Sequence, residues 1–513
     1  MNRIQVVFFL LMTVLTSTGL YAQMDSYHAS VETQGVLTTK NTVPFWMRAN
    51  QFGSVPLPGV SGSVIGMLRK DYDTLGNMPT DDVSGDHTKV IDWGAGLEIR
   101  GDMGYGLRSR LNLIEGYAKL KVSIFELKAG RTKDIMGLVD TTLSSGAFSV
   151  SGNALGIPKI SLAIPNYWNL PLTGGLLAIK GNFAHGWIGQ QPIVTGYLYF
   201  VNEQTYYHQS SFYGRLGKEN WSLKLYGGVN HQAYWGMRAH DKGYQLSEFK
   251  SFEYVVLGKT YHGSKVGNHI GSVDLGLTYD FPGVTLSLYR QSFYDEGALS
   301  KLANIKDGMN GISLTNTAYD PEAGGFQWHK LLFEFFYTKD QAGYPTSRVT
   351  KSGDENYYNN NEYYEGWSYK GVGLGNPFIT PYMSTRKNLV NDIPDYFNNN
   401  RVVAFYGGAD FSVEDFHFVG KASYTLNYGT FGTSIWGHSR GTTFYPPRYG
   451  IWQEVRQFSG YLEVNKPFGD TGWQIGCVAA LDNGGLFYNS GGFLLKLKRS
   501  FGNPESHNVR WDQ

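Results

Sequence analysis

Residues 437–441 form a serine motif of the kind that hydrolases use. They read GHSRG, which matches the G-x-S-x-G pattern of a nucleophile elbow centred on Ser439. Such an elbow needs a strand before the serine and a helix after it, because that turn exposes the hydroxyl beside oxyanion donors. Residues 442–447 read TTFYPP, which does not favour a helix. We therefore predict no catalytic residues and no enzymatic activity, and the variant Ser439→Ala tests the hydrolase alternative.

Ligand-like residues are scattered along the chain and form no familiar metal motif. Residues 71–76 read DYDTLG and resemble the start of a calcium loop, but Leu75 stands where an oxygen ligand is needed. Asp81, Asp82 and Asp86 leave weak divalent-ion binding open, although a solvated acidic loop is the simpler interpretation. The 12 histidines show no H-E-x-x-H or comparable ligand spacing. We predict no metal and no cofactor.

One segment has a composition suited to sugars. Residues 356–369 read NYYNNNEYYEGWSY and contain Tyr357, Tyr358 and Trp367. Aromatic faces stack on the apolar faces of sugar rings, while amides and carboxylates hydrogen-bond to hydroxyl groups. These three residues are therefore candidates for polysaccharide binding. The alternative is an interfacial aromatic belt followed by a polar loop.

The elements that position these residues are strands with a period of two. Residues 273–280 and 284–289 alternate apolar and polar side chains around a Phe-Pro-Gly turn, which is a hairpin signature. Similar alternation predicts strands at 93–100, 118–127, 176–183, 221–229, 331–337, 402–408, 416–428, 461–464 and 493–498. After the apolar run at residues 6–15 near the N-terminus, no stretch of the sequence is long and apolar enough for a membrane helix. A spanning chain must then satisfy its amides in a closed sheet, so we expect an all-β outer-membrane barrel.

Composition and the chain ends agree with this fold class. The chain contains 36 tyrosines, 30 phenylalanines, 12 tryptophans and 65 glycines, and only 17% of its residues are charged. Such a composition is typical of outer-membrane barrels. A net charge of +1 argues against nucleic acid as a partner. We expect 1–22 to be a cleaved signal peptide, 23–92 to lead into the barrel, 93–501 to form it and 502–513 to be a polar tail. The segments 71–89, 241–264, 304–327 and 341–400 read as long loops, and 134–172 as a plug, an inward loop or a periplasmic turn region.

Several short motifs, in order along the chain, resemble the Wzi family of capsule-assembly outer-membrane proteins. They are TVPFWMRANQFGSVP at 42–56, SSGAF at 144–148, SGNALGIP at 151–158, GGVNHQAYWG at 227–236, VGNHIGSVD at 266–274, YRQSFYDEG at 289–297 and NIKDGMNGI at 304–312. The resemblance implies a barrel of about 18 antiparallel strands with long extracellular loops, whose periplasmic end is obstructed. It also implies a lectin that retains capsular or extracellular polysaccharide, with outer-membrane lipid and capsule export machinery as further partners.

The family-like motifs supply the remaining candidates for polysaccharide binding. These residues are His231, Trp235, Asn268, His269, Asp295 and Asp307. The alternative is that they shape lumenal packing or strand turns. An outer-membrane porin or uptake channel is the alternative function, since it would show the same strand alternation.

Overall fold

A computed structural model describes residues 26–73, 89–104, 107–195, 199–236, 246–261, 264–320, 323–344, 346–350, 353–393 and 395–501. The expected signal peptide at 1–22 and the expected tail at 502–513 therefore lie outside the described residues. In the described part of the chain, no helix is long and apolar enough to cross a membrane.

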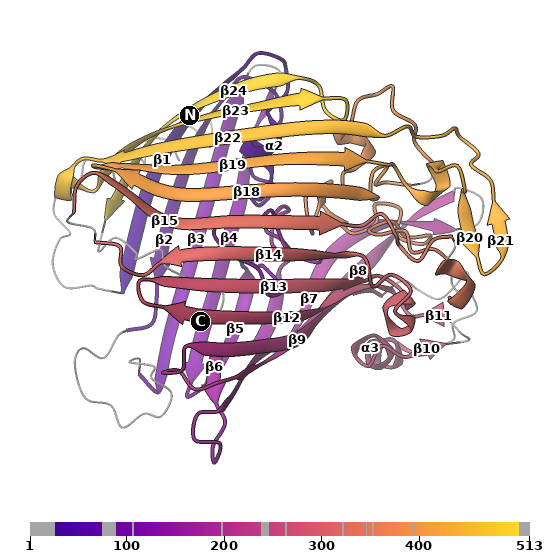
Figure 1. Ribbon diagram of the computed structural model, residues 1–513, viewed down its shortest axis with the longest axis horizontal. Coiled ribbons are helices and arrows are strands. Elements are labelled where there is room, and N and C mark those ends of the chain that lie inside the picture. The colour runs from indigo at the N-terminus through magenta and orange to yellow at the C-terminus, as the bar shows by residue number, and fades with distance from the viewer. Residues whose placement is uncertain are drawn as a thin grey trace.

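The chain folds into a closed antiparallel barrel of 18 strands (Figure 1). The first and last barrel strands pair with each other, with Ala29 opposite Phe501, so the sheet has no free edge. This confirms the predicted fold class. The barrel strands are β1 (Tyr27–Thr38), β2 (Ser61–Lys70), β3 (Ile91–Gly104), β4 (Leu107–Val122), β5 (Phe125–Arg131), β6 (Lys159–Asn169), β7 (Leu177–Thr195), β8 (Tyr199–Leu216), β9 (Leu223–Trp235), β12 (Asn268–Phe281), β13 (Val284–Tyr294), β14 (Gly308–Asn316), β15 (Phe326–Tyr337), β18 (Val402–Val413), β19 (Phe416–Asn427), β22 (Val455–Pro467), β23 (Trp473–Gly484) and β24 (Ser490–Phe501).

Smaller elements lie in the connections between barrel strands. They are the helices α2 (Phe45–Arg48) and α3 (Glu248–Val256), the short strand pairs β10 (Thr260–Tyr261) with β11 (Ser264–Lys265), β16 (Ser368–Tyr369) with β17 (Val372–Gly373) and β20 (His438–Arg440) with β21 (Thr443–Tyr445), and 3-10 turns at Ala298–Lys301, Thr346–Val349, Tyr382–Ser384, Phe431–Thr433 and Gly469–Thr471.

The period of two gives barrel strands such as β12 an apolar outer face and a polar inner face. On β12, Val273 and Leu275 face outward and are 41% and 65% exposed, whereas Asp274 between them is fully buried. Because the outer face of a membrane barrel meets lipid, exposed apolar side chains there are expected. The polar side chains of the inner face can therefore form hydrogen bonds with the loops that enter the lumen.

Three sequence predictions about the strands were wrong in detail. The barrel begins at β1, so the segment 23–92 already contributes two barrel strands; β1 carries ETQG at 32–35, which hides its alternation. Residues 118–127 are the β4–β5 hairpin, because Ser123 adopts a positive φ of 56° and turns the chain. The loop predicted at 304–327 contains β14.

The two ends of the barrel differ. We call the end where β1 begins and β24 ends the terminal end, and the opposite end the loop end. Most terminal-end connections are short, such as 123–124, 282–283 and 414–415. The loop end carries the long segments 39–60, 132–158, 236–267, 295–307, 338–401 and 428–454. Since outer-membrane barrels have short periplasmic turns and longer extracellular loops, the loop end corresponds to the extracellular side.

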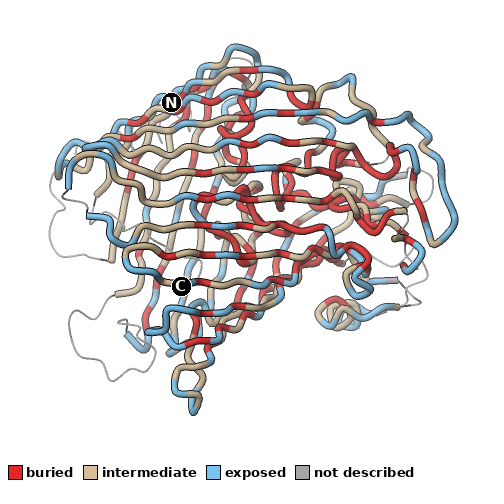
Figure 2. The backbone as a smooth tube through the Cα atoms, viewed as in Figure 1, coloured by how far each residue is buried: buried red, intermediate tan, exposed pale blue. Residues whose placement is uncertain are grey.

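Loops from the loop end fill the adjacent half of the lumen. Buried residues concentrate in that half of the molecule (Figure 2). The largest buried cluster joins Trp46 of α2, Leu138 and Phe148 of 132–158, and Tyr357 and Trp367 of 338–401. The expected obstruction at the periplasmic end stays a prediction. The strand directions place these loops at the other end, where their apolar side chains find a closed interior to pack into.

Candidate functional site

Inward-facing carboxylates of the barrel wall hold the loop 132–158. Asp274 on β12 accepts hydrogen bonds from the amide of Leu138 and the hydroxyl of Tyr213, both at 2.9 Å. Glu334 on β15 accepts from the amide of Ser145 at 2.7 Å and from the hydroxyl of Tyr289 at 2.5 Å. A buried carboxylate is stable only when such donors surround it. The wall therefore fixes the backbone of this loop inside the lumen.

The loop 338–401 packs directly on 132–158. The indole nitrogen of Trp367 donates to the carbonyl of Ser149 at 2.7 Å, and the hydroxyl of Tyr358 donates to the carbonyl of Phe148. The ring of Trp367 lies 4.5 Å from the ring of Tyr234 on β9, measured between centroids. The two loops and the wall therefore form one packed unit.

This packing places the predicted sugar-stacking residues in the interior. Tyr357, Tyr358 and Trp367 are at most 1% exposed. A ring must expose a face to stack on a sugar, and both faces of these rings are covered by protein. The expectation of an exposed aromatic surface at 356–369 was therefore wrong. The aromatic rings of this segment are buried because the loop folds into the lumen.

Asp295 and Asp307 are brought together with Tyr357 beneath the loop end. Asp307 accepts from the amide of Gln341 at 2.7 Å and from the hydroxyl of Tyr357 at 2.8 Å, and Asp295 accepts from the amide of Tyr358 at 3.1 Å. Burial is the main influence on these groups: it raises the pKa of Asp307 to about 8 against the effect of its donors, and it raises the pKa of Asp295 well above its ordinary value. These carboxyls join the loops 295–307 and 338–401.

The other predicted residues lie apart from this cluster, on β9 and β12 near the loop end. The ring nitrogens of His231 and His269 are 2.8 Å apart, and both rings are on the outer side of the wall. Trp235 packs against Phe252 of α3, which covers this patch of wall from outside. Asn268 is 3% exposed. Only His231 among the four is more than slightly accessible, and their polysaccharide role stays a prediction.

The residues 434–451, which include the β20–β21 hairpin, present an aromatic surface that the sequence reasoning missed. Trp436, Phe444, Tyr445 and Tyr449 are each between 43% and 49% exposed. The hairpin projects from the loop end, at the right of Figure 1. We call these four residues the hairpin patch. These aromatic residues lie in the sequence WGHSRGTTFYPPRY at 436–449, which we interpreted only as a serine motif.

Basic side chains and a supporting ring surround the hairpin patch. The centroid of the Tyr344 ring lies 4.9 Å from the ring centroids of Trp436 and Phe444. Arg348, Arg440 and Arg448 are all exposed nearby in the loops 338–401 and 428–454. Exposed rings beside guanidinium groups can stack on sugar rings and pair with acidic substituents.

The serine motif itself does not form an elbow. Ser439 is in the short strand β20, 1% exposed, and is followed by a turn and β21, with no helix in residues 441–450. Its amide donates to Asp354 at 2.6 Å, and the adjacent His438 bonds the same carboxylate at 2.8 Å. These contacts attach the hairpin to the loop 338–401. The motif therefore has a structural explanation.

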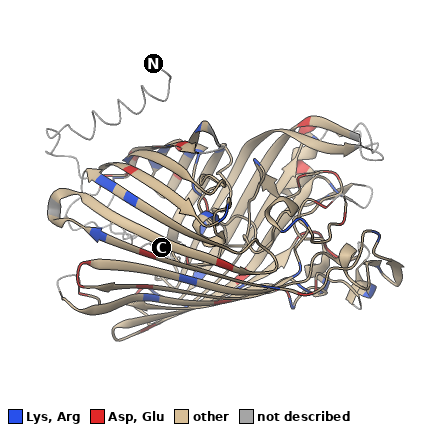
Figure 3. Cartoon of the chain, turned by 90° about the horizontal axis from the view of Figure 1, so that it is seen from above, with Lys and Arg blue, Asp and Glu red and all other residues tan. Residues whose placement is uncertain are grey.

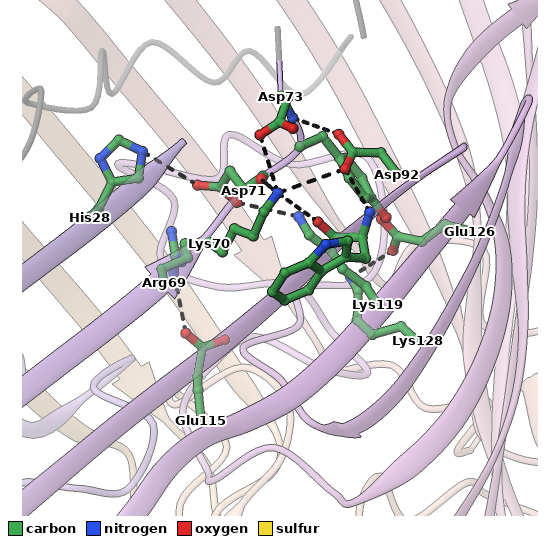
Figure 4. A network of polar contacts seen from close by, with 12 residues as sticks. His28, Arg69, Lys70, Asp71, Asp73, Asp92, Glu115, Lys119, Glu126 and Lys128 are labelled. Atoms are coloured by element: carbon green, nitrogen blue, oxygen red, sulfur yellow. Dashed lines mark hydrogen bonds and ion pairs between the residues drawn. The ribbon is translucent and has the colours of Figure 1, made fainter. Parts of the chain in front are cut away.

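Charged residues also lie in the half of the barrel near the terminal end. Acidic and basic side chains are interspersed over the molecule (Figure 3). A network on β1–β5 near the terminal end includes Lys70, which lies 3.7 Å from Asp92, and Arg69, which lies 3.3 Å from Glu115 (Figure 4). Between β5–β8 and the loop 132–158 is a cavity of ≈ 270 Å³ that is lined by both polar and apolar residues, with Lys128 among them. Charged side chains therefore line part of the lumen that the loops do not fill.

Comparisons with known proteins identify one family. A family model described as "Capsule assembly protein Wzi" matches residues 78–404, more than half of the chain. No curated protein matches. Similar solved structures include Acinetobacter baumannii OccAB4, at 9% identity over 93% of this chain and 99% of that one with a TM-score of 0.43. Another is Pseudomonas aeruginosa OpdK with vanillate, at 11% identity over 94% and 100% of the two chains with a TM-score of 0.42.

Proposed function

The chain belongs to the Wzi family of capsule assembly proteins, and we propose that it is an outer-membrane lectin that holds capsular or extracellular polysaccharide at the cell surface. In this proposal the protein is exported by a cleavable signal peptide and has no enzymatic activity. Its partners are the polysaccharide, outer-membrane lipid and the capsule export machinery.

The filling of the lumen is the observation that carries the proposal beyond the family. A porin needs an open path between the two barrel ends, whereas here three loops occupy the half of the lumen next to the loop end. Carboxylates of the wall bind the backbone of one of these loops through several hydrogen bonds. A barrel built in this way supports loops at the cell surface better than it conducts solutes.

The hairpin patch is the surface that we assign to the polymer. Its four aromatic side chains offer stacking faces, and the exposed Arg348, Arg440 and Arg448 favour a polymer that carries acidic groups. Each contact with one sugar unit is weak. A repeating polymer can engage many copies of the protein at once, so effective concentration makes retention strong.

Capsule retention in a strain that lacks the protein tests the proposal. We expect the polymer to be released into the medium in the deletion strain and to return to the cell with the wild-type protein. Retention of polymer without the protein would refute the assembly role.

Two matched tryptophans test the assigned surface. Trp436 in the hairpin patch and Trp221 in a terminal-end turn are both 48% exposed. We expect Trp436→Ala to weaken binding of the purified polymer and Trp221→Ala to leave it unchanged. Equal binding by both variants would move the site away from the hairpin.

A further inference from the structure

Three potential metal ligands meet on the inner wall near the terminal end. His329 is on β15, Asp410 on β18 and His417 on β19, which are neighbouring strands. The Nδ1 atom of His329 lies 2.8 Å from Oδ1 of Asp410, and Nε2 of His417 lies 2.7 Å from the same oxygen. All three side chains are partly accessible, with relative exposures of 21%, 25% and 38%.

A bulge in β15 brings His329 to this position. Successive residues of a strand normally point to opposite faces. Here the register shifts between Trp328 and Lys330, opposite β18. As a result Lys330 reaches Asp140 inside the lumen at 2.9 Å, while His329, the residue before it, also reaches the lumenal Asp410. Bulges of this kind re-aim single side chains near functional sites.

A further hydrogen bond, with Ser412, holds the ring of His329 in place. The remaining ring nitrogen of His329, Nε2, lies 3.0 Å from the hydroxyl of Ser412. Metal-bound histidines usually donate their second ring N–H to such an oxygen, which fixes the tautomer and directs the other nitrogen at the ion. The rings of His329 and His417 are nearly parallel, at 18° with centroids 5.5 Å apart. Both rings therefore face the carboxylate without a large rotation.

The distances suit a small divalent ion after a slight opening. Zinc binds imidazole nitrogen and carboxylate oxygen at about 2.0–2.2 Å, so ligand atoms on one tetrahedral ion are ~3.3 Å apart. The two nitrogen–oxygen pairs here are 2.7–2.8 Å apart, so each of these two pairs must separate by ~0.5 Å. Side-chain rotation supplies that movement because the three residues are only partly buried.

We propose that His329, Asp410 and His417 bind a divalent transition-metal ion such as Zn²⁺, through His329 Nδ1, Asp410 Oδ1 and His417 Nε2, with water completing the coordination. Two imidazoles and a carboxylate with open positions suit Zn²⁺ and similar ions. The ion links three adjacent strands near the terminal end. The site could not be predicted from the sequence because its ligands meet only when β15, β18 and β19 pair.

Titration of Zn²⁺ into the purified, chelator-treated full-length protein in detergent tests the proposal. We expect one high-affinity ion per chain, at least ~10-fold weaker binding in His417→Ala, and a ~10–100-fold loss in Ser412→Ala. His28→Ala is the matched control, since His28 also faces a carboxylate, Asp71 at 3.8 Å, near the terminal end. Unchanged Zn²⁺ affinity in His417→Ala, or loss of binding in His28→Ala, would overturn the assignment.

A spectrum keeps the test decisive if a variant fails to fold. Co²⁺ bound to the wild-type protein should show the visible absorption of a tetrahedral nitrogen and oxygen site, and Zn²⁺ should remove it. A wild-type protein that takes up neither ion stoichiometrically would refute the site. Asp410→Asn, which keeps the size of the side chain and removes its charge, should weaken the Co²⁺ signal without changing the gel mobility of the folded barrel.

Discussion

Replacing Trp367 should loosen the loop packing and leave the barrel intact. Its side chain is fully buried, contacts Tyr234, and donates to the carbonyl of Ser149. Truncation of a buried tryptophan to alanine costs about 3–5 kcal/mol. Since about 1.4 kcal/mol corresponds to a tenfold change in an equilibrium constant, local opening of the loop should become ~10²–10⁴-fold more frequent. Trp367→Phe keeps most of the packing and loses only the N–H, so it should cost about 1–3 kcal/mol.

Hydrogen exchange of individual amides measures this opening. The amide of Leu374 bonds to the carbonyl of Trp367, and the amide of Ser151 bonds to the carbonyl of Leu374, so both report on the junction of the two loops. They should exchange faster in Trp367→Ala, with a smaller effect in Trp367→Phe. The ladder amide of Leu332 on β15 should not change. Unchanged exchange at Leu374 and Ser151 would refute the packing argument. In the same experiment Trp436→Ala should stay near wild type, within about 0.5 kcal/mol, because its side chain is exposed.

Three further predictions follow from other parts of the molecule. The side chain of Asp102 is fully buried and bonds Arg100 and Arg110, each at 2.8 Å. Asp102→Ala should therefore lower the free energy of unfolding of the barrel by about 3–5 kcal/mol, measured by urea unfolding. An unchanged urea midpoint would contradict this. Burial lowers the pKa of His438, but its bonds to two carboxylates outweigh this and raise it to about 10. The folded loop therefore keeps a proton that the open loop loses above about pH 6.5. Docking of the loop 428–454 should be strongest below that pH and be lost as the pH rises toward 10, which increasing protease cleavage of the loop would show. His438→Gln should show no such pH dependence. The same increase of cleavage with pH in both proteins would refute the prediction. The purified protein should show little conductance in planar bilayers, and a steady ohmic current would favour the porin alternative.

The alternation of single strands was a reliable guide because it is a local property. A residue on a barrel strand faces lipid or lumen according to its position alone, as Val273 and Asp274 illustrate. The burial of Trp367 could not be predicted in this way. Its environment consists of Ser149 and Tyr234, which are distant in sequence, and a Tyr-rich and Asn-rich loop has the same composition whether it enters a lumen or faces solvent.

The candidate site shows the same limit. The hairpin patch was present in the sequence as a run of aromatic residues around 436–449, but only the structure shows that the hairpin projects while the richer run at 356–369 is buried. The metal-ligand cluster was invisible for a different reason. Asp410 and His417 are close in sequence, whereas His329 joins them through strand pairing and a bulge, which no spacing rule contains.

The pairing of β1 with β24 has a consequence for biogenesis. The hydroxyl of Thr33 bonds to the carbonyl of Leu497, across 464 residues of chain. Contacts between such distant residues are slow to form because the loop-closure entropy must be lost first. Until the last strand is added, β1 and β23 are open edges that can pair with other chains. The loop 132–158 also reaches its final contacts only after β12 and β15 are in place. Closure of the wall and packing of the interior therefore both depend on strands in the C-terminal half of the chain.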